Sequence, residues 1–216
     1  MAVLIAVIVT FGFSQTIEGG LIHPSFSIPA ILYIHVAVFI GWIFLLIIQT
    51  GLIQTNRTNL HRKFGLTSLC LGVALPVVGI WVSIVMARIG AQQSGPQAAI
   101  FLIVPFADML NFSTLFGMAI WNRKNVEAHR RLMLMATWSL TGAAFGRFPS
   151  FIVPYGGWYY LAVDMMIFLG VARDFFVLRK VHRVYLIGLP LLMVSQSITL
   201  LIFYSDWWAH WSQRFI

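Results

Sequence analysis

The sequence is poor in charged residues and has almost no cysteine. Asp, Glu, Lys and Arg make up 9% of the 216 residues, whereas a soluble globular domain carries roughly a quarter. Hydrophobic residues make up 60%. This shortage of charge excludes an ordinary soluble domain and indicates a membrane protein with several spans. The single cysteine, Cys70, excludes a disulfide framework and a cysteine-based metal cluster.

Long apolar segments alternate with short polar loops along the chain. A membrane-spanning helix needs about 20 mostly apolar residues. Six segments meet this requirement: 30–53, 65–88, 98–121, 131–148, 158–177 and 184–205. A shorter apolar segment, 2–13, precedes them and predicts a short first helix, with a signal anchor as the alternative. We therefore expect one all-α transmembrane bundle over residues 1–216, with about seven spans, in which the hairpins 30–88, 98–148 and 158–205 follow the first helix.

Basic residues are concentrated in three of the loops. They are Arg57, Arg62 and Lys63 in the first, Arg123, Lys124, Arg130 and Arg131 in the second, and Arg179, Lys180 and Arg183 in the third. The positive-inside rule then places these loops and the N-terminus in the cytoplasm and the C-terminus outside. This topology accounts for most of the net charge of +8, and no nucleic-acid partner is needed. The Trp-rich tail, 206–216, is expected to lie flat at the outer interface, or to contact a partner subunit.

Several polar side chains fall inside the predicted spans, where they are costly and therefore candidates for function. Seven-residue spacing puts His35, Trp42 and Gln49 on one helical face. The other candidates are Asp108, Asn111, Arg147, Asp164 and Gln196. We expect His35, Asp108, Arg147 and Asp164 to converge on a pocket in the outer half of the membrane. The alternatives are an ion pair between Arg147 and one aspartate, and hydrogen bonds between helices from Asn111 and Gln196.

Three histidines of the basic loops each precede an arginine, in the pairs His61-Arg62, His129-Arg130 and His182-Arg183. Imidazole nitrogens ligate haem iron, and arginines neutralise haem propionates. His61 and His129 are therefore candidate ligands of a b-type haem near the cytoplasmic surface, with His35 as a ligand of a second centre. The alternative is that these histidines bind lipid headgroups or loop carbonyls. The sequence pattern identifies no other metal site.

An ordered set of motifs runs through the first two thirds of the chain. It consists of His35, Trp42, Gln49, Leu60-His61-Arg62 with Gly65, Glu127-x-His129-Arg130-Arg131-x-Met133, and Gly146-Arg147. This set resembles a family of bacterial multi-span inner-membrane proteins of unknown function. The resemblance implies a helical bundle with His35, His61, His129, Arg130 and Arg147 on the family's motif positions, and it supplies no reaction or ligand.

Three functions fit these observations. The favoured hypothesis is an accessory or assembly subunit of a larger respiratory or photosynthetic membrane complex, without independent catalytic activity. Its partners would be membrane lipids, which we expect to be bound, and other membrane-protein subunits. The second hypothesis is an electron-transfer protein that binds a b-type haem or a quinone. The third is a small-solute or proton-coupled transporter that uses Asp108 and His35 as titrating groups.

Overall fold

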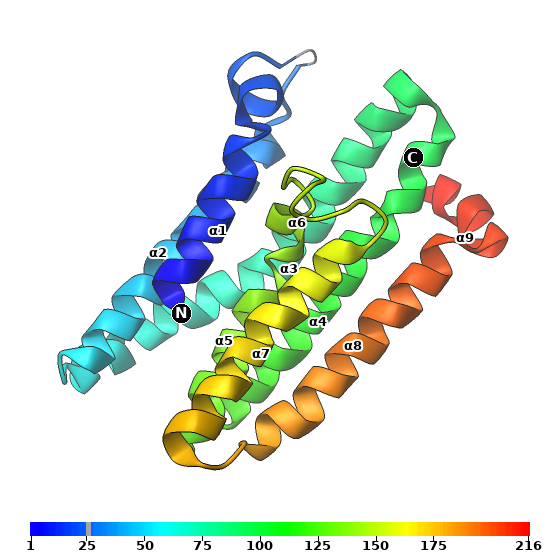
Figure 1. Ribbon diagram of the computed structural model, residues 1–216. Helices are drawn as coiled ribbons and strands as arrows, with labels where there is room; N and C mark the ends of the chain where they lie inside the picture. Colours follow the sequence, from blue (N-terminus) through cyan, green and yellow to red (C-terminus); the bar gives the residue numbers. More distant parts are fainter. Residues whose placement is uncertain (25–26) are drawn as a thin grey trace.

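The chain is helical throughout the part that the structure describes. The computed structural model describes residues 1–24 and 27–216 (Figure 1). The longer helices are α1 (Ala2–Ser14), α2 (Ala30–Gln54), α3 (Thr58–Ser94), α4 (Ile103–Trp121), α5 (Val126–Ser139), α7 (Trp158–Leu178) and α8 (Arg183–Phe203). The shorter elements are α6 (Gly142–Phe145), α9 (Asp206–Trp211), a π-helical turn at Glu18–Ile22 and 3-10 turns at Pro96–Leu102 and Ser212–Phe215. The described residues contain no strand, so the predicted all-α class is confirmed.

Four helical segments are long and apolar enough to cross a membrane, which fits a membrane protein. They are α2, α3, the continuous segment Pro96–Trp121, and α8. α7 has the required length, 21 residues, but it contains Asp164, Arg173 and Asp174. α1 and α5 have only 13 and 14 residues. The structure therefore identifies four candidate spans among its described residues, whereas the sequence predicts about seven.

The helices run up and down, so the loops gather at two ends of the bundle. Figure 1 shows the loops after α2, α4 and α7 toward the lower left, and α9 with the turn after α3 toward the upper right. We call the first group, residues 55–57, 122–125 and 179–182 with the helix turns that follow them, the basic end. The opposite group is called the far end. All but three of the 14 lysines and arginines (Arg88, Arg147 and Arg214) belong to the basic end or its adjoining turns.

The hydrophobic core is centred on α4 and α5. Phe112, Met135 and Trp138 are completely buried, and the ring of Phe112 stacks on that of Phe116, 5.5 Å away. Helix α3 packs closely against α4 at Gly72, where a Cβ atom would overlap the Phe116 ring. A glycine here lets an aromatic ring fill the space between the two helices.

The segment 131–148 differs from the single span that the sequence predicts. Helix α5 begins earlier, at Val126, because the Asn125 side chain accepts a hydrogen bond from the Ala128 amide and caps it. It ends at Ser139, where the hydroxyl groups of Ser139 and Thr141 donate to backbone carbonyls three residues earlier. Such local bonds compete with regular helix hydrogen bonding, so the chain forms a turn before the short α6.

The C-terminal tail packs on its own chain. The Trp208 side chain is buried, and its Nε1 donates to the Ile100 carbonyl at 2.8 Å. Arg88 Nε donates to the Phe215 carbonyl at 2.9 Å. The tail therefore covers the 3-10 turn Pro96–Leu102 at the far end, while Trp207 keeps 61% of its surface exposed. The predicted short helix in the tail is present, and its inner face contacts this chain.

Candidate functional site

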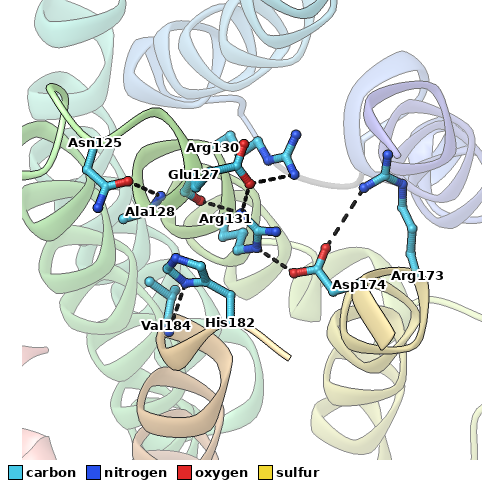
Figure 2. Close-up of polar contacts among 9 residues, drawn as sticks. All are labelled: Asn125, Glu127, Ala128, Arg130, Arg131, Arg173, Asp174, His182 and Val184. Atoms are coloured by element: carbon cyan, nitrogen blue, oxygen red, sulfur yellow. Dashed lines mark hydrogen bonds and ion pairs between the residues drawn. The ribbon is translucent and has the colours of Figure 1, made fainter. Parts of the chain in front are cut away.

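A buried arginine organises the polar contacts of the basic end. The side chain of Arg131, near the start of α5, is 2% exposed. Its Nε donates to Asp174 Oδ2 on α7 at 2.6 Å, and its Nη1 donates to Glu127 Oε2 at 2.5 Å. Nη1 also donates to the Glu127 carbonyl at 2.8 Å. Figure 2 shows the guanidinium between the two carboxylates, which ties α5 to α7.

Exposed side chains surround this buried pair. Arg130 lies 2.8 Å from Glu127 Oε2, and Arg173 lies 3.9 Å from Asp174 Oδ1. His182 caps α8, because its Nδ1 accepts a hydrogen bond from the Val184 amide at 3.2 Å (Figure 2). The cap requires an unprotonated Nδ1, since only a nitrogen with a free lone pair accepts.

The charges of this cluster shift two pKa values in the same direction. The hydrogen bond from Arg131 holds the pKa of Glu127 below its ordinary value. Partial burial, followed by the positive charge of Arg131, lowers the pKa of His182. Glu127 is therefore a carboxylate and His182 a neutral imidazole at neutral pH.

Sequence reasoning missed this ion network as a site. It used Arg131 as a loop charge for orientation and as part of the Glu127–Met133 motif, and it gave Asp174 no role. One signal was available: Glu127 precedes Arg131 by four residues, the spacing at which a carboxylate and an arginine meet on one helical face.

The histidines of the basic end divide into two environments. His129 Nδ1 lies 2.8 Å from the Ala119 carbonyl. A nitrogen facing a carbonyl oxygen must carry the proton, so Nε2 of His129 is left with a free lone pair. His61 lies within electrostatic range of His129, and its Nδ1 is buried without a hydrogen-bond partner in the described part of the chain. His182, by contrast, belongs to the Arg131 cluster.

Gln49 and Trp42 occupy the same face of α2, as predicted, and contact two different helices. Gln49 Nε2 donates to Ser68 Oγ of α3 at 2.9 Å, and Gln49 Oε1 has no partner among the described residues. Trp42 Nε1 approaches Thr137 Oγ1 of α5 at 3.4 Å. These polar side chains therefore connect α2 to its neighbours.

The pocket expected from His35, Asp108, Arg147 and Asp164 is not a single hydrogen-bonded cluster in the described structure. Asp108 accepts a hydrogen bond from the Tyr160 hydroxyl at 3.2 Å. Asp164 accepts one from Gln196 Nε2, also at 3.2 Å. The two aspartates lie on different helices, α4 and α7, and accept from separate neutral partners, so the shared pocket stays a prediction. The predicted role of Gln196 in joining helices is confirmed.

Arg147 and His35 lie near each other and apart from these pairs. Arg147 donates to the Ala143 carbonyl and to Thr16 Oγ1, and its guanidinium lies 4.4 Å from the centre of the Phe13 ring. No described carboxylate comes within ion-pair distance of it, so the predicted Arg147–Asp pair was wrong. His35 packs on Phe39 and lies within electrostatic range of Arg147.

Two further expectations concern Asn111 and metal ions. Asn111 lies on α4, and its role in joining helices stays a prediction. Residues 1–24 and 27–216 contain no group of three His, Cys, Asp or Glu side chains placed to hold a metal ion.

Comparison of the chain with models of protein families, with curated proteins and with solved structures finds no match.

Proposed function

We propose that this chain spans a bacterial inner membrane about seven times, with the basic end and the N-terminus in the cytoplasm and the C-terminus outside. Support comes from the loops after α2, α4 and α7, which lie at one end of the bundle and, together with the adjoining helix turns, carry most of the basic residues (Figure 1). Cytoplasmic loops are enriched in Lys and Arg. On this view three further spans add to the four more apolar candidates. They are α1, α5 together with α6, and α7.

Cysteine labelling in spheroplasts tests this orientation. Cys70 is replaced by serine, and a new cysteine is introduced at Lys124 of the basic end or at the exposed Tyr155 of the far end. An impermeant maleimide is expected to label Tyr155→Cys in intact spheroplasts, and Lys124→Cys only after permeabilisation. The C70S parent serves as the unlabelled control, and the reverse labelling pattern would contradict the proposal.

Within the membrane, the chain would act as an accessory or assembly subunit of a larger respiratory or photosynthetic complex. The observation that carries this proposal is that several buried polar side chains are bonded between helices. Arg131 bonds α5 to α7, Gln196 bonds α8 to α7, and Trp42 contacts α5 from α2. Polar groups that are hydrogen-bonded between helices hold those helices in a fixed arrangement, and a fixed arrangement suits a supporting subunit.

Native electrophoresis after gentle solubilisation tests the accessory role. The tagged chain should migrate with an assembly much heavier than its own 24.4 kDa, and its removal should lower the abundance of that assembly. Recovery of the isolated monomer alone, with normal assembly of the respiratory complexes in its absence, would contradict the role.

A b-type haem protein is the second candidate, favoured by the state of His129. Its Nδ1–H donates to a carbonyl, which orients the ring and leaves Nε2 available as a ligand. His61 has a buried nitrogen without a partner, and Arg62 and Arg130 are adjacent in sequence for the propionates. These residues fit a haem, which would supply electron transfer.

An absorption spectrum of the purified protein tests the haem candidate. A reduced-minus-oxidised band of b-type haem is expected, and His61→Ala and His129→Ala should remove it. His210→Ala, at the exposed far end, is the matched control and should leave the band unchanged. A protein purified from haem-replete cells without this band would exclude the candidate.

A further inference from the structure

A groove opens between α7 and α8 on the far half of the bundle. Its volume is about 260 Å³, and the buried side chains of Asp164 and Gln196 lie at its floor. Each of these two residues is only 4% exposed. The groove is therefore a mostly apolar depression with a polar floor; this lining is typical of small-molecule sites, and the volume is just below their usual range of roughly 300–1,000 Å³.

The floor presents hydrogen-bond acceptors. Gln196 Nε2 donates to Asp164 Oδ1 at 3.2 Å, and this bond uses one oxygen of the carboxylate and the amide nitrogen. Asp164 Oδ2 and Gln196 Oε1 accept no hydrogen bond from another described residue, and neither is enclosed by protein. A carboxylate and an amide oxygen can only accept, so a ligand at this floor has to donate.

The residues that form the walls of the groove indicate the chemistry of the rest of the ligand. Trp158 and Tyr160 contribute aromatic surface, and Leu161 and Met193 contribute apolar surface. Leu161 and Met193 are 41% and 40% exposed, so the groove continues onto the outer surface of the helix pair. In a membrane this surface faces lipid, and the groove is open to molecules that diffuse within the bilayer.

We infer that the groove between α7 and α8 binds the head of a membrane-soluble aromatic alcohol, of the quinol class, whose hydroxyl groups donate to Asp164 Oδ2 and Gln196 Oε1. A groove of about 260 Å³ accommodates one substituted ring, and the apolar tail lies along Leu161 and Met193. The inference concerns binding alone, and it is independent of the accessory role and of the haem candidate.

A quinol and its quinone provide a matched pair of probes. Decylubiquinol and decylubiquinone share the ring and the tail, but only the quinol has hydroxyl donors. Their binding is measured by quenching of tryptophan fluorescence, without oxygen, on the full chain in phosphatidylcholine nanodiscs at pH 8. The quinol is expected to bind at least about tenfold more tightly, because the quinone leaves the floor acceptors without a partner.

Three variants locate the site. Asp164→Asn replaces an acceptor by a donor at the floor and should reduce the preference for quinol to less than about threefold. Asp108→Asn is the matched control, because Asp108 bonds to Tyr160 and does not line the groove, and it should keep the preference. Ser197→Phe, at the exposed rim, should weaken both probes about equally by filling the groove, and it serves if Asp164→Asn fails to fold.

Several results would overturn the inference. One is equal binding of the two probes to the parent protein. Another is a preference for quinol that is unchanged in Asp164→Asn or that is lost in Asp108→Asn as well. The last is unchanged binding of both probes to Ser197→Phe.

Discussion

The two ends of this bundle use their scarce carboxylates in different ways. At the basic end, Asp174 and Glu127 both bond to the buried guanidinium of Arg131. In the far half, Asp108 and Asp164 bond to a neutral hydroxyl and a neutral amide. The first arrangement balances buried charge within the protein, whereas the second leaves each aspartate without a cationic partner.

This difference separates a structural role from a binding role. A buried ion pair contributes defined geometry, and it is strongly destabilising to break because one charge is then left without its partner. A carboxylate bonded to a neutral group keeps acceptor capacity, as Asp164 does beside the groove. The basic end is therefore expected to dominate stability, whereas the groove proposed to bind a quinol lies in the far half.

Removing Arg131 should give the largest loss of stability. Arg131→Met leaves the buried carboxylate of Asp174 with only the exposed Arg173, 3.9 Å away, and we expect the free energy of unfolding to fall by about 3–5 kcal/mol. The control Arg130→Gln breaks only an exposed pair with Glu127 and should cost about 0–1 kcal/mol. Denaturation of the two proteins in detergent measures both values. Equal losses would erase the distinction between the buried and exposed pairs.

Close packing, not charge, joins α1 to α6 in the far half. A Cβ atom at Gly12 would overlap the backbone carbonyl of Ala144. Gly12→Ala should therefore destabilise the protein by about 1–3 kcal/mol, since the backbone on either side has to shift. Gly51→Ala, on α2, meets open space and should be neutral or stabilising by up to about 1 kcal/mol. The same denaturation experiment compares them, and equal effects would mean that α1 does not pack in this way.

The hydrogen bond between Tyr160 and Asp108 should contribute less to stability than the ion network around Arg131. Tyr160→Phe removes the hydroxyl that donates to Asp108, and we expect a loss of about 1–2 kcal/mol in the free energy of unfolding. Tyr155→Phe, at an exposed position of the far end, is the control and should change little. A loss as large as that of Arg131→Met would show that the two halves depend on their polar contacts equally.

The helices of this chain were predictable from apolar runs to different degrees. The runs 30–53, 158–177 and 184–205 agree with α2, α7 and α8 within one or two residues, since polar residues, a proline or glycines border them closely. Helix α3 extends well beyond its apolar run 65–88, from Thr58 to Ser94. Hydrophobicity marks the residues that leave water, whereas a helix continues through polar residues with adequate helix propensity.

The pairing of the polar side chains was beyond the reach of the sequence. Helical spacing correctly put Trp42 and Gln49 on one face, because that follows from the geometry of a single helix. Arg131 and Asp174 are 43 residues apart, and their contact depends on which faces of α5 and α7 meet. The same holds for Asp164 and Gln196, each recognised as an unusual polar residue without its partner being identified.

The smallest effect should come from His182, where pH acts on one helix cap of the basic end. The pKa of His182 is lowered in the folded protein by partial burial and then by Arg131, so the unfolded chain takes up the proton at a higher pH. Stability contributed by the neutral cap is then complete above pH about 6.5 and decreases as the pH falls below it. His182→Asn keeps a capping acceptor without a titrating group. Denaturation at pH 7.5 and at pH 5.5 measures how far the free energy of unfolding falls between the two values. This fall should be smaller in the variant than in the parent, with a difference of less than about 1 kcal/mol. An identical fall in both proteins would mean that protonation does not act through this cap.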